Sequence, residues 1–109
     1  MPETEEHPCK VIKIETGYGN LYINIMDRDD KPLKIICTIG KSGQSTMAKA
    51  MVTGTMVSLA LKYGAPIDEI IEKLSGIRGD HPFTGPHGVV WSIPDAVAKA
   101  LKIYMEGRE

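Results

Sequence analysis

The segment Gly40-Lys41-Ser42-Gly43 has the residue types of a phosphate-binding loop, which ends in Gly-Lys-Ser or Gly-Lys-Thr at the start of a helix. Such a loop also needs a glycine five positions before its last one, and Ile35 stands there, inside an alternating strand pattern. The sequence therefore excludes this class of nucleotide hydrolase. A weaker site remains, because the backbone N–H groups of residues 43–45 at a helix N-terminus, with Lys41 nearby, can hold one anion. The alternative is a Gly-Ser turn that only caps a core helix.

A second candidate for binding is Arg78, at the start of the glycine-rich segment 76–90. Its guanidinium is a planar fork of donors suited to phosphate or carboxylate. If the fold brings the two segments together, they would form one recognition surface for a protein acid, a nucleotide or a nucleic-acid backbone. The residues expected to bind an anion or a partner are Gly40, Lys41, Ser42, Gly43 and Arg78.

The remaining reactive residues do not assemble a catalytic or metal site in the sequence. His81 and His87 lie six residues apart beside Asp80, which is no standard zinc spacing. Cys9 and Cys37 are isolated and are expected to be free thiols, with a Cys9–Cys37 disulfide as the alternative. No nucleophile, base and oxyanion hole occur within a recognisable spacing. We therefore expect no metal, no cofactor and no enzyme activity from this chain on its own.

Composition sets the class of protein. The 109 residues are 42% hydrophobic and 25% charged, which fits one globular domain with one modest core. The formal net charge of −1 provides no overall positive field for nucleic acid, so such a role would need a local patch. No apolar stretch approaches membrane-spanning length and the first residues are acidic. We expect a cytoplasmic protein with a mobile tail at 1–8, one domain at 9–109 and no membrane partner.

Three strands are expected in the first third of the chain. Residues 9–16 are rich in β-branched side chains and end at a Gly-Tyr-Gly-Asn turn. Residues 21–26 and 33–39 alternate aliphatic with other side chains at a period of two, on either side of a charged turn. These patterns predict a three-stranded antiparallel meander.

Three helices are expected after the meander. Apolar residues at three- and four-residue spacing predict a helix over 44–63, and Pro66 with the stripe up to Leu74 predicts a shorter one. Ser92 and Asp95 form a capping box for the third. Segment 76–90 has no periodicity and is expected to be an irregular loop of functional importance. The fold class is α+β, with a meander followed by three helices in two layers.

Four large apolar side chains carry further expectations. Met47, Met51 and Met56 on the long helix are expected in the core, with an adaptable partner surface as the alternative. Trp91, just before the third helix, is expected to be a core anchor or a hydrophobic staple.

From Val11 to Leu101 the sequence resembles the TSCPD domain family, named for a Thr-Ser-Cys-Pro-Asp motif. The matching segments, in order, are Glu15-Thr16-Gly17-Tyr18-Gly19, Gly40-Lys41-Ser42-Gly43, Leu74-Ser75-Gly76-Ile77-Arg78 and Ser92 to Leu101. The resemblance implies an appendage of the kind found at the C-terminal end of adenosylcobalamin-dependent ribonucleotide reductases, which also occurs as small separate proteins. The radical chemistry of those reductases belongs to a large barrel domain, so the resemblance implies no catalysis here.

The chain departs from the family at three positions where members usually carry cysteine. Tyr18, Gly79 and Ile93 stand at these positions. If those cysteines hold a metal or act in redox chemistry in typical members, this chain lacks the thiolates for it. His81, His87 and Cys9 do not replace them at the same positions.

These observations favour a non-catalytic accessory module that binds a macromolecular partner, either a ribonucleotide reductase or nucleic acid. The first alternative is a sensor that binds a nucleotide or another anion at residues 40–45. The second is a structural homo-oligomer assembled through the free strand edge of the meander.

Overall fold

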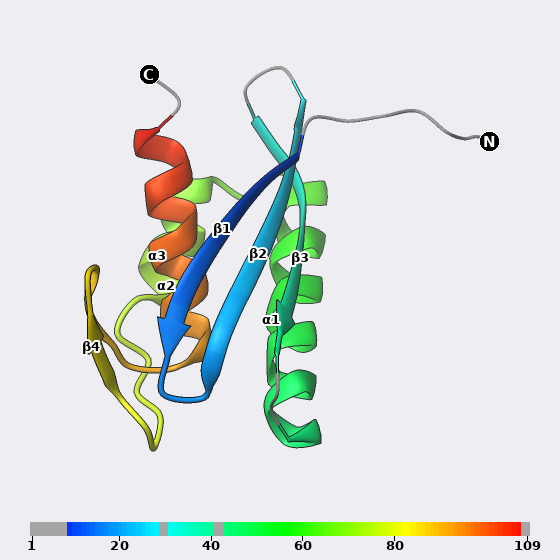
Figure 1. Cartoon of the computed structure of the whole chain (residues 1–109). Coiled ribbons are helices and arrows are strands. Elements are labelled where there is room, and N and C mark those ends of the chain that lie inside the picture. The colour runs from blue at the N-terminus through cyan, green and yellow to red at the C-terminus, as the bar shows by residue number, and fades with distance from the viewer. Residues whose placement is uncertain (1–8, 29–30, 41–42, 108–109) are drawn as a thin grey trace.

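The computed structural model describes residues 9–28, 31–40 and 43–107 (Figure 1). The expected tail at 1–8 lies outside the described residues, as do Lys41 and Ser42. The described elements follow the order β1 (Cys9–Thr16), β2 (Gly19–Arg28), β3 (Lys31–Ile39), α1 (Gln44–Lys62), α2 (Ile67–Leu74), β4 (Phe83–Gly85), β5 (Gly88–Val90) and α3 (Ile93–Glu106). The α+β class and the order of meander before helices are confirmed.

Strands β1, β2 and β3 form an antiparallel sheet in that order. Ile14 pairs with Leu21, and Ile23 pairs with Cys37, so side chains two residues apart share one face. That inner face is the centre of the core, and its most buried members are Ile14, Leu21, Ile23, Ile25, Ile35 and Cys37. The period of two in the sequence therefore arises because every second side chain is buried between the sheet and the helices.

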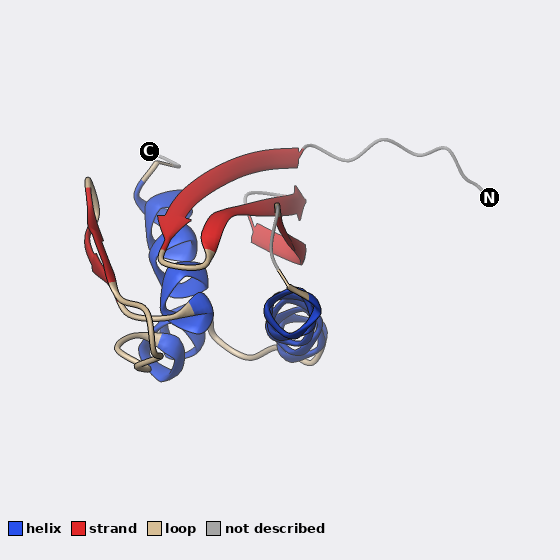
Figure 2. Cartoon of the chain, turned by 60° about the horizontal axis from the view of Figure 1, so that its bottom comes forward, coloured by secondary structure: helices blue, strands red, loops and turns tan. Residues whose placement is uncertain are grey.

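Helix α1 packs along β3, and α3 lies under β1 and β2 on the same side of the curled sheet (Figure 2). Small residues let α1 approach the strand closely. The hydroxyl of Ser58 accepts from the N–H of Ile35 at 3.0 Å and donates to its carbonyl at 2.9 Å. A Cβ on Gly54 would lie 3.2 Å from both N and Sγ of Cys37. Helix α1 thus satisfies the backbone N–H and C=O of Ile35 at the outer edge of β3. Fewer backbone groups at this edge remain for pairing with a strand of another chain.

The segment 76–90 contains a hairpin that the sequence did not predict. Strands β4 and β5 pair from Phe83 with Val90 to Gly85 with Gly88. Two three-residue strands are too short to show a period of two, and Gly88 adopts a φ of +83° that closes the turn. The expectation of a wholly irregular loop was therefore wrong.

The expectation that the methionines of α1 lie in the core was also wrong. Met47, Met51 and Met56 are 45%, 62% and 54% exposed, so they are not core residues. The buried side of α1 carries the small residues Ala50 and Gly54, because β3 lies too close for long side chains. Trp91 is only half-buried, so it is no core anchor, whereas its neighbour Val90 is buried.

No helix in the described part of the chain is long and apolar enough to cross a membrane.

Candidate functional site

The start of α3 is fixed by Ser92. Its hydroxyl accepts from the N–H of Asp95 at 3.2 Å, as an N-cap residue does, and donates to the carbonyl of Ile77 at 2.6 Å. The first hydrogen bond confirms the predicted cap. The second ties the cap to the segment that follows α2, so Ser92 joins two elements.

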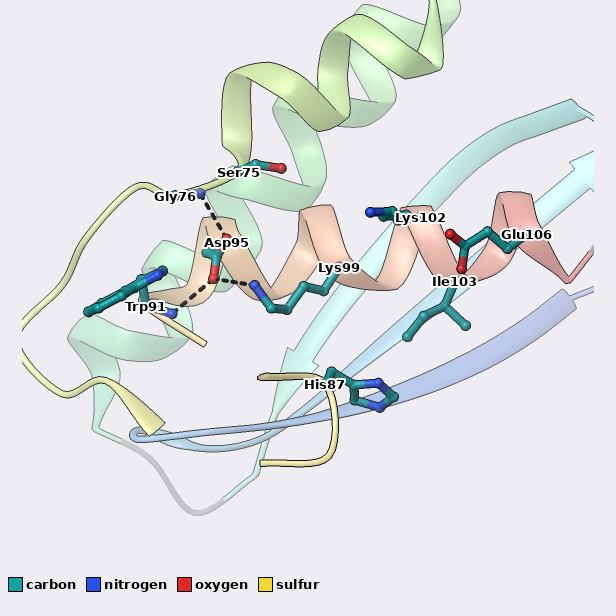
Figure 3. Close-up of a pocket in the computed structure, with 9 residues that line it drawn as sticks. All are labelled: Ser75, Gly76, His87, Trp91, Asp95, Lys99, Lys102, Ile103 and Glu106. Carbon is teal, nitrogen blue, oxygen red and sulfur yellow. Dashed lines mark hydrogen bonds and ion pairs between the residues drawn. The ribbon is translucent and has the colours of Figure 1, made fainter. Parts of the chain in front are cut away.

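Asp95 is the centre of a polar network between α2 and α3 (Figure 3). Its carboxylate accepts from the N–H of Gly76 at 2.8 Å, the N–H of Trp91 at 2.9 Å and Nζ of Lys99 at 2.9 Å. The side chain is only 2% exposed. Asp95 therefore holds the end of α2 and the chain entering α3 in one arrangement.

The environment of Asp95 favours its ionised form. Burial raises the pKa of the carboxyl group, but the N–H donors of Gly76 and Trp91 and the ammonium of Lys99 outweigh burial. The pKa of Asp95 consequently lies below its ordinary value. A carboxylate that is ionised at neutral pH and has three donors acts as an anchor for its neighbours, since its oxygens are already engaged.

A hollow of about 450 Å³ opens beside this network. Its walls carry charges of both signs, with Lys99 and Lys102 against Asp95 and Glu106 on α3. His87, from the turn between β4 and β5, lies across the hollow from α3 (Figure 3). The other lining residues are Ser75, Gly76, Trp91 and Ile103.

The guanidinium of Arg78 lies over the ring of Trp91, one of the residues that line this hollow. The central carbon of the guanidinium is 4.1 Å from the ring centroid. Such stacking holds the guanidinium plane while its N–H edges stay available for acceptors. Trp91 itself lines the hollow, and Arg78 is exposed.

The predicted anion site at residues 40–45 is described only in part. Gly43 is the N-cap of α1, with extended backbone and no side-chain cap, and the first turn of α1 contains no acidic residue. The N–H of Gly40 donates to the carbonyl of Asn20 at 3.4 Å. Lys41 and Ser42 lie outside the described residues. That residues 40–45 and Arg78 form one recognition surface therefore stays a prediction.

Two of the three positions at which the resemblance to the TSCPD family implies a cysteine are in direct contact. A Cβ on Gly79 would lie 2.5 Å from the hydroxyl oxygen of Tyr18 and 3.3 Å from Cβ of Ser92. The third, Ile93, is buried and follows Ser92 in the chain. A phenol, a hydrogen atom and an aliphatic group supply no thiolate, so the residues present do not fit a metal held by cysteines.

His81 has a local partner instead. Its ring meets the ring of Tyr18 edge to face at 5.3 Å, and its backbone N–H donates to the hydroxyl of Tyr18 at 3.3 Å. Within residues 9–28, 31–40 and 43–107, no three His, Cys, Asp or Glu side chains gather as metal ligands would.

Comparison with known proteins identifies the family. A sequence profile of the TSCPD domain matches residues 2–105. The chain belongs to the TSCPD domain family. It is also 28% identical over 114 aligned residues to a vitamin B12-dependent ribonucleotide reductase of Rhodopirellula baltica. This TSCPD domain chain is matched over 100% of its length but spans only 11% of the reductase. No solved structure matches it.

Some of these residues have a recognisable pattern in the sequence, and others do not. The capping-box pattern in the sequence identified Ser92 and Asp95. A capping box predicts that the Asp95 carboxylate accepts a hydrogen bond from the backbone N–H of Ser92. The carboxylate instead reaches the N–H groups of Trp91 and Gly76. No sequence pattern predicted the contact of Arg78 with Trp91, because the β4–β5 hairpin separates the two residues in the chain.

Proposed function

We propose that this TSCPD domain is a non-catalytic binding module, and that it contacts a partner protein through Arg78, Trp91 and the adjoining hollow. The observation that carries the proposal is the contact of Arg78 with the ring of Trp91, a residue that lines a hollow with charges of both signs. Arg and Trp are the residue types that most often dominate binding energy at protein interfaces. Held over the indole, the exposed guanidinium can bind a carboxylate of the partner with two parallel hydrogen bonds.

The charge pattern favours a protein over nucleic acid. A nucleic-acid surface concentrates Lys and Arg, whereas the hollow that Trp91 lines also carries the carboxylate of Glu106. The net charge of the chain is −1. A protein surface that presents acidic and basic groups together complements this hollow better than a row of phosphates does.

A ribonucleotide reductase is the first candidate partner. In Rhodopirellula baltica the similar sequence forms 11% of a reductase chain, so the two parts are covalently joined there. We expect this TSCPD domain to make the same contact with a reductase. On this proposal the radical chemistry stays with the partner, and the domain contributes binding only.

The proposal is tested by measuring the affinity of the purified chain for the ribonucleotide reductase of the same cell. Arg78→Ala should weaken binding by about tenfold or more, since loss of a dominant interface residue costs more than about 1 kcal/mol. Arg78→Lys should be intermediate, because it keeps the charge but not the planar fork. Arg28→Ala removes an exposed arginine at the end of β2 and is the matched control.

Two further arms separate the alternatives. Binding to single-stranded or duplex DNA that weakens in Arg78→Ala would replace the protein partner with nucleic acid. A melting temperature raised by nucleotides in the parent and in Arg78→Ala alike would support the anion site at residues 40–45. Unchanged reductase affinity in a folded Arg78→Ala protein would overturn the proposal.

A further inference from the structure

We infer that α1 pairs with α1 of a second copy of this chain, antiparallel, through an apolar outer stripe. The outer stripe consists of Val52, Met56, Leu59 and the C-cap residue Tyr63, which follow each other at spacings of four, three and four residues. They are 60%, 54%, 45% and 76% exposed. This is the spacing with which one helix packs against another along a seam.

The outer stripe is the second apolar stripe of the same helix. The first, Ala50, Gly54, Val57 and Leu61, has the same spacing and faces the core. Between Ala50 and Leu61 the sequence contains no charged residue, and Lys49 and Lys62 are the only charged residues of α1. A helix that is apolar on two sides is typical of a helix that is covered on two sides. The described residues of the chain cover only one.

The shape of the surface beside the outer stripe suits a second copy. An apolar groove of about 480 Å³ runs between α1 and α2, and Val52 and Met56 form part of its wall. Tyr63, the most exposed large apolar residue of the chain's described part, stands at the other end of the same stripe. An antiparallel pair related by a two-fold axis places Tyr63 of each copy beside Val52 and the groove of the other. The same contact then forms twice.

Two further features favour the antiparallel direction, namely the apolar contact of Met56 with Leu59 and the separation of the two Lys62 side chains. Met56 of one copy then lies opposite Leu59 of the other, so each layer of the seam is filled by apolar side chains. A parallel pair would instead place Lys62 beside Lys62 and Tyr63 beside Tyr63. Like charges at matching positions are unfavourable, so the antiparallel arrangement is preferred.

The first test is the oligomeric state of the full chain, measured by sedimentation across a dilution series. We expect the mass of two chains, dissociating to one on dilution. Met56→Glu should give the mass of one chain with an unchanged circular dichroism spectrum. Ile77→Glu changes an exposed isoleucine outside α1 and is the matched control. A single-chain mass for the parent at every concentration, or a two-chain mass for Met56→Glu, would overturn the inference.

The second test reads the direction of the pair. In a Cys9→Ser background, a mixture of Val52→Cys and Tyr63→Cys proteins should form the mixed disulfide-linked dimer on mild oxidation. Links between two Val52→Cys chains only would contradict the antiparallel arrangement. Arg78 lies outside the outer stripe, so reductase binding by Met56→Glu separates failure of the dimer from failure of the proposed function.

Discussion

The hydroxyl of Tyr18 fills the space into which any side chain at position 79 would project. The N–H groups of Asp80 and His81 donate to it at 2.9 and 3.3 Å, which holds the ring in place. A Cβ on Gly79 would stand 2.5 Å from that oxygen. The β1–β2 turn and the segment after α2 are therefore joined by a phenol and a glycine that depend on each other.

Substitution of these two residues should show coupling. Gly79→Ala should lower the free energy of unfolding by about 1–3 kcal/mol, because the new methyl group clashes with the Tyr18 hydroxyl. Tyr18→Phe removes the clashing oxygen at the cost of its hydrogen bonds. The double variant should therefore be more stable than the sum of the two effects predicts, when measured by urea unfolding. Simple additivity would contradict the contact.

The same positions predict the response to metal. With Tyr18, Gly79 and Ile93 in place of cysteines, the purified protein should contain no stoichiometric zinc, and a chelator should leave its melting temperature unchanged. Elemental analysis is the measurement. About one zinc per chain would show that other residues hold a metal.

Ser92→Ala should destabilise the protein by about 0.5–2 kcal/mol while leaving the fold intact. The hydroxyl caps α3 and also bonds to the carbonyl of Ile77, so two hydrogen bonds are lost. Urea unfolding measures the change. Ser75→Ala is the control, because the Ser75 hydroxyl bonds only to the carbonyl of Ile71 at an exposed helix end and should contribute little. Equal losses in the two variants would contradict the capping role.

Asp95 should make stability depend on pH in the acid range. Its pKa is lower in the folded chain than in the unfolded chain, so the stabilisation is present above the unfolded value of about 4 and is lost as pH falls through the folded value. Asp95→Asn should cost about 1.5–3 kcal/mol at neutral pH. The difference from the parent should shrink below about pH 4 in urea unfolding series, and a constant difference would contradict it.

The two thiols should react very differently. Cys9 is exposed, whereas burial raises the pKa of Cys37 to about 12. A thiol reagent at neutral pH should therefore modify one cysteine per folded chain rapidly and the second only on unfolding. Cys9→Ser should abolish the rapid phase. Rapid modification of the Cys9→Ser protein would show that Cys37 is accessible.

Local pattern was enough to predict the elements that form through local rules. The strands alternate with a period of two, and α2 carries acids in its first turn and one apolar stripe. Ser92 caps a helix through a bond to a residue three positions away. Each of these features depends on residues that are close together in the chain, so residue type and spacing are enough to predict it.

Tertiary structure decided which apolar residues are buried and which polar ones meet. Both stripes of α1 have helical spacing, and only the approach of β3 to Gly54 and Ser58 selects the inner one, which leaves Met56 outside. Tyr18 meets Gly79, and Arg78 meets Trp91, because separate turns and hairpins arrive at one place. Contacts of this kind depend on how whole elements pack, and packing distance leaves no periodic trace in a single sequence.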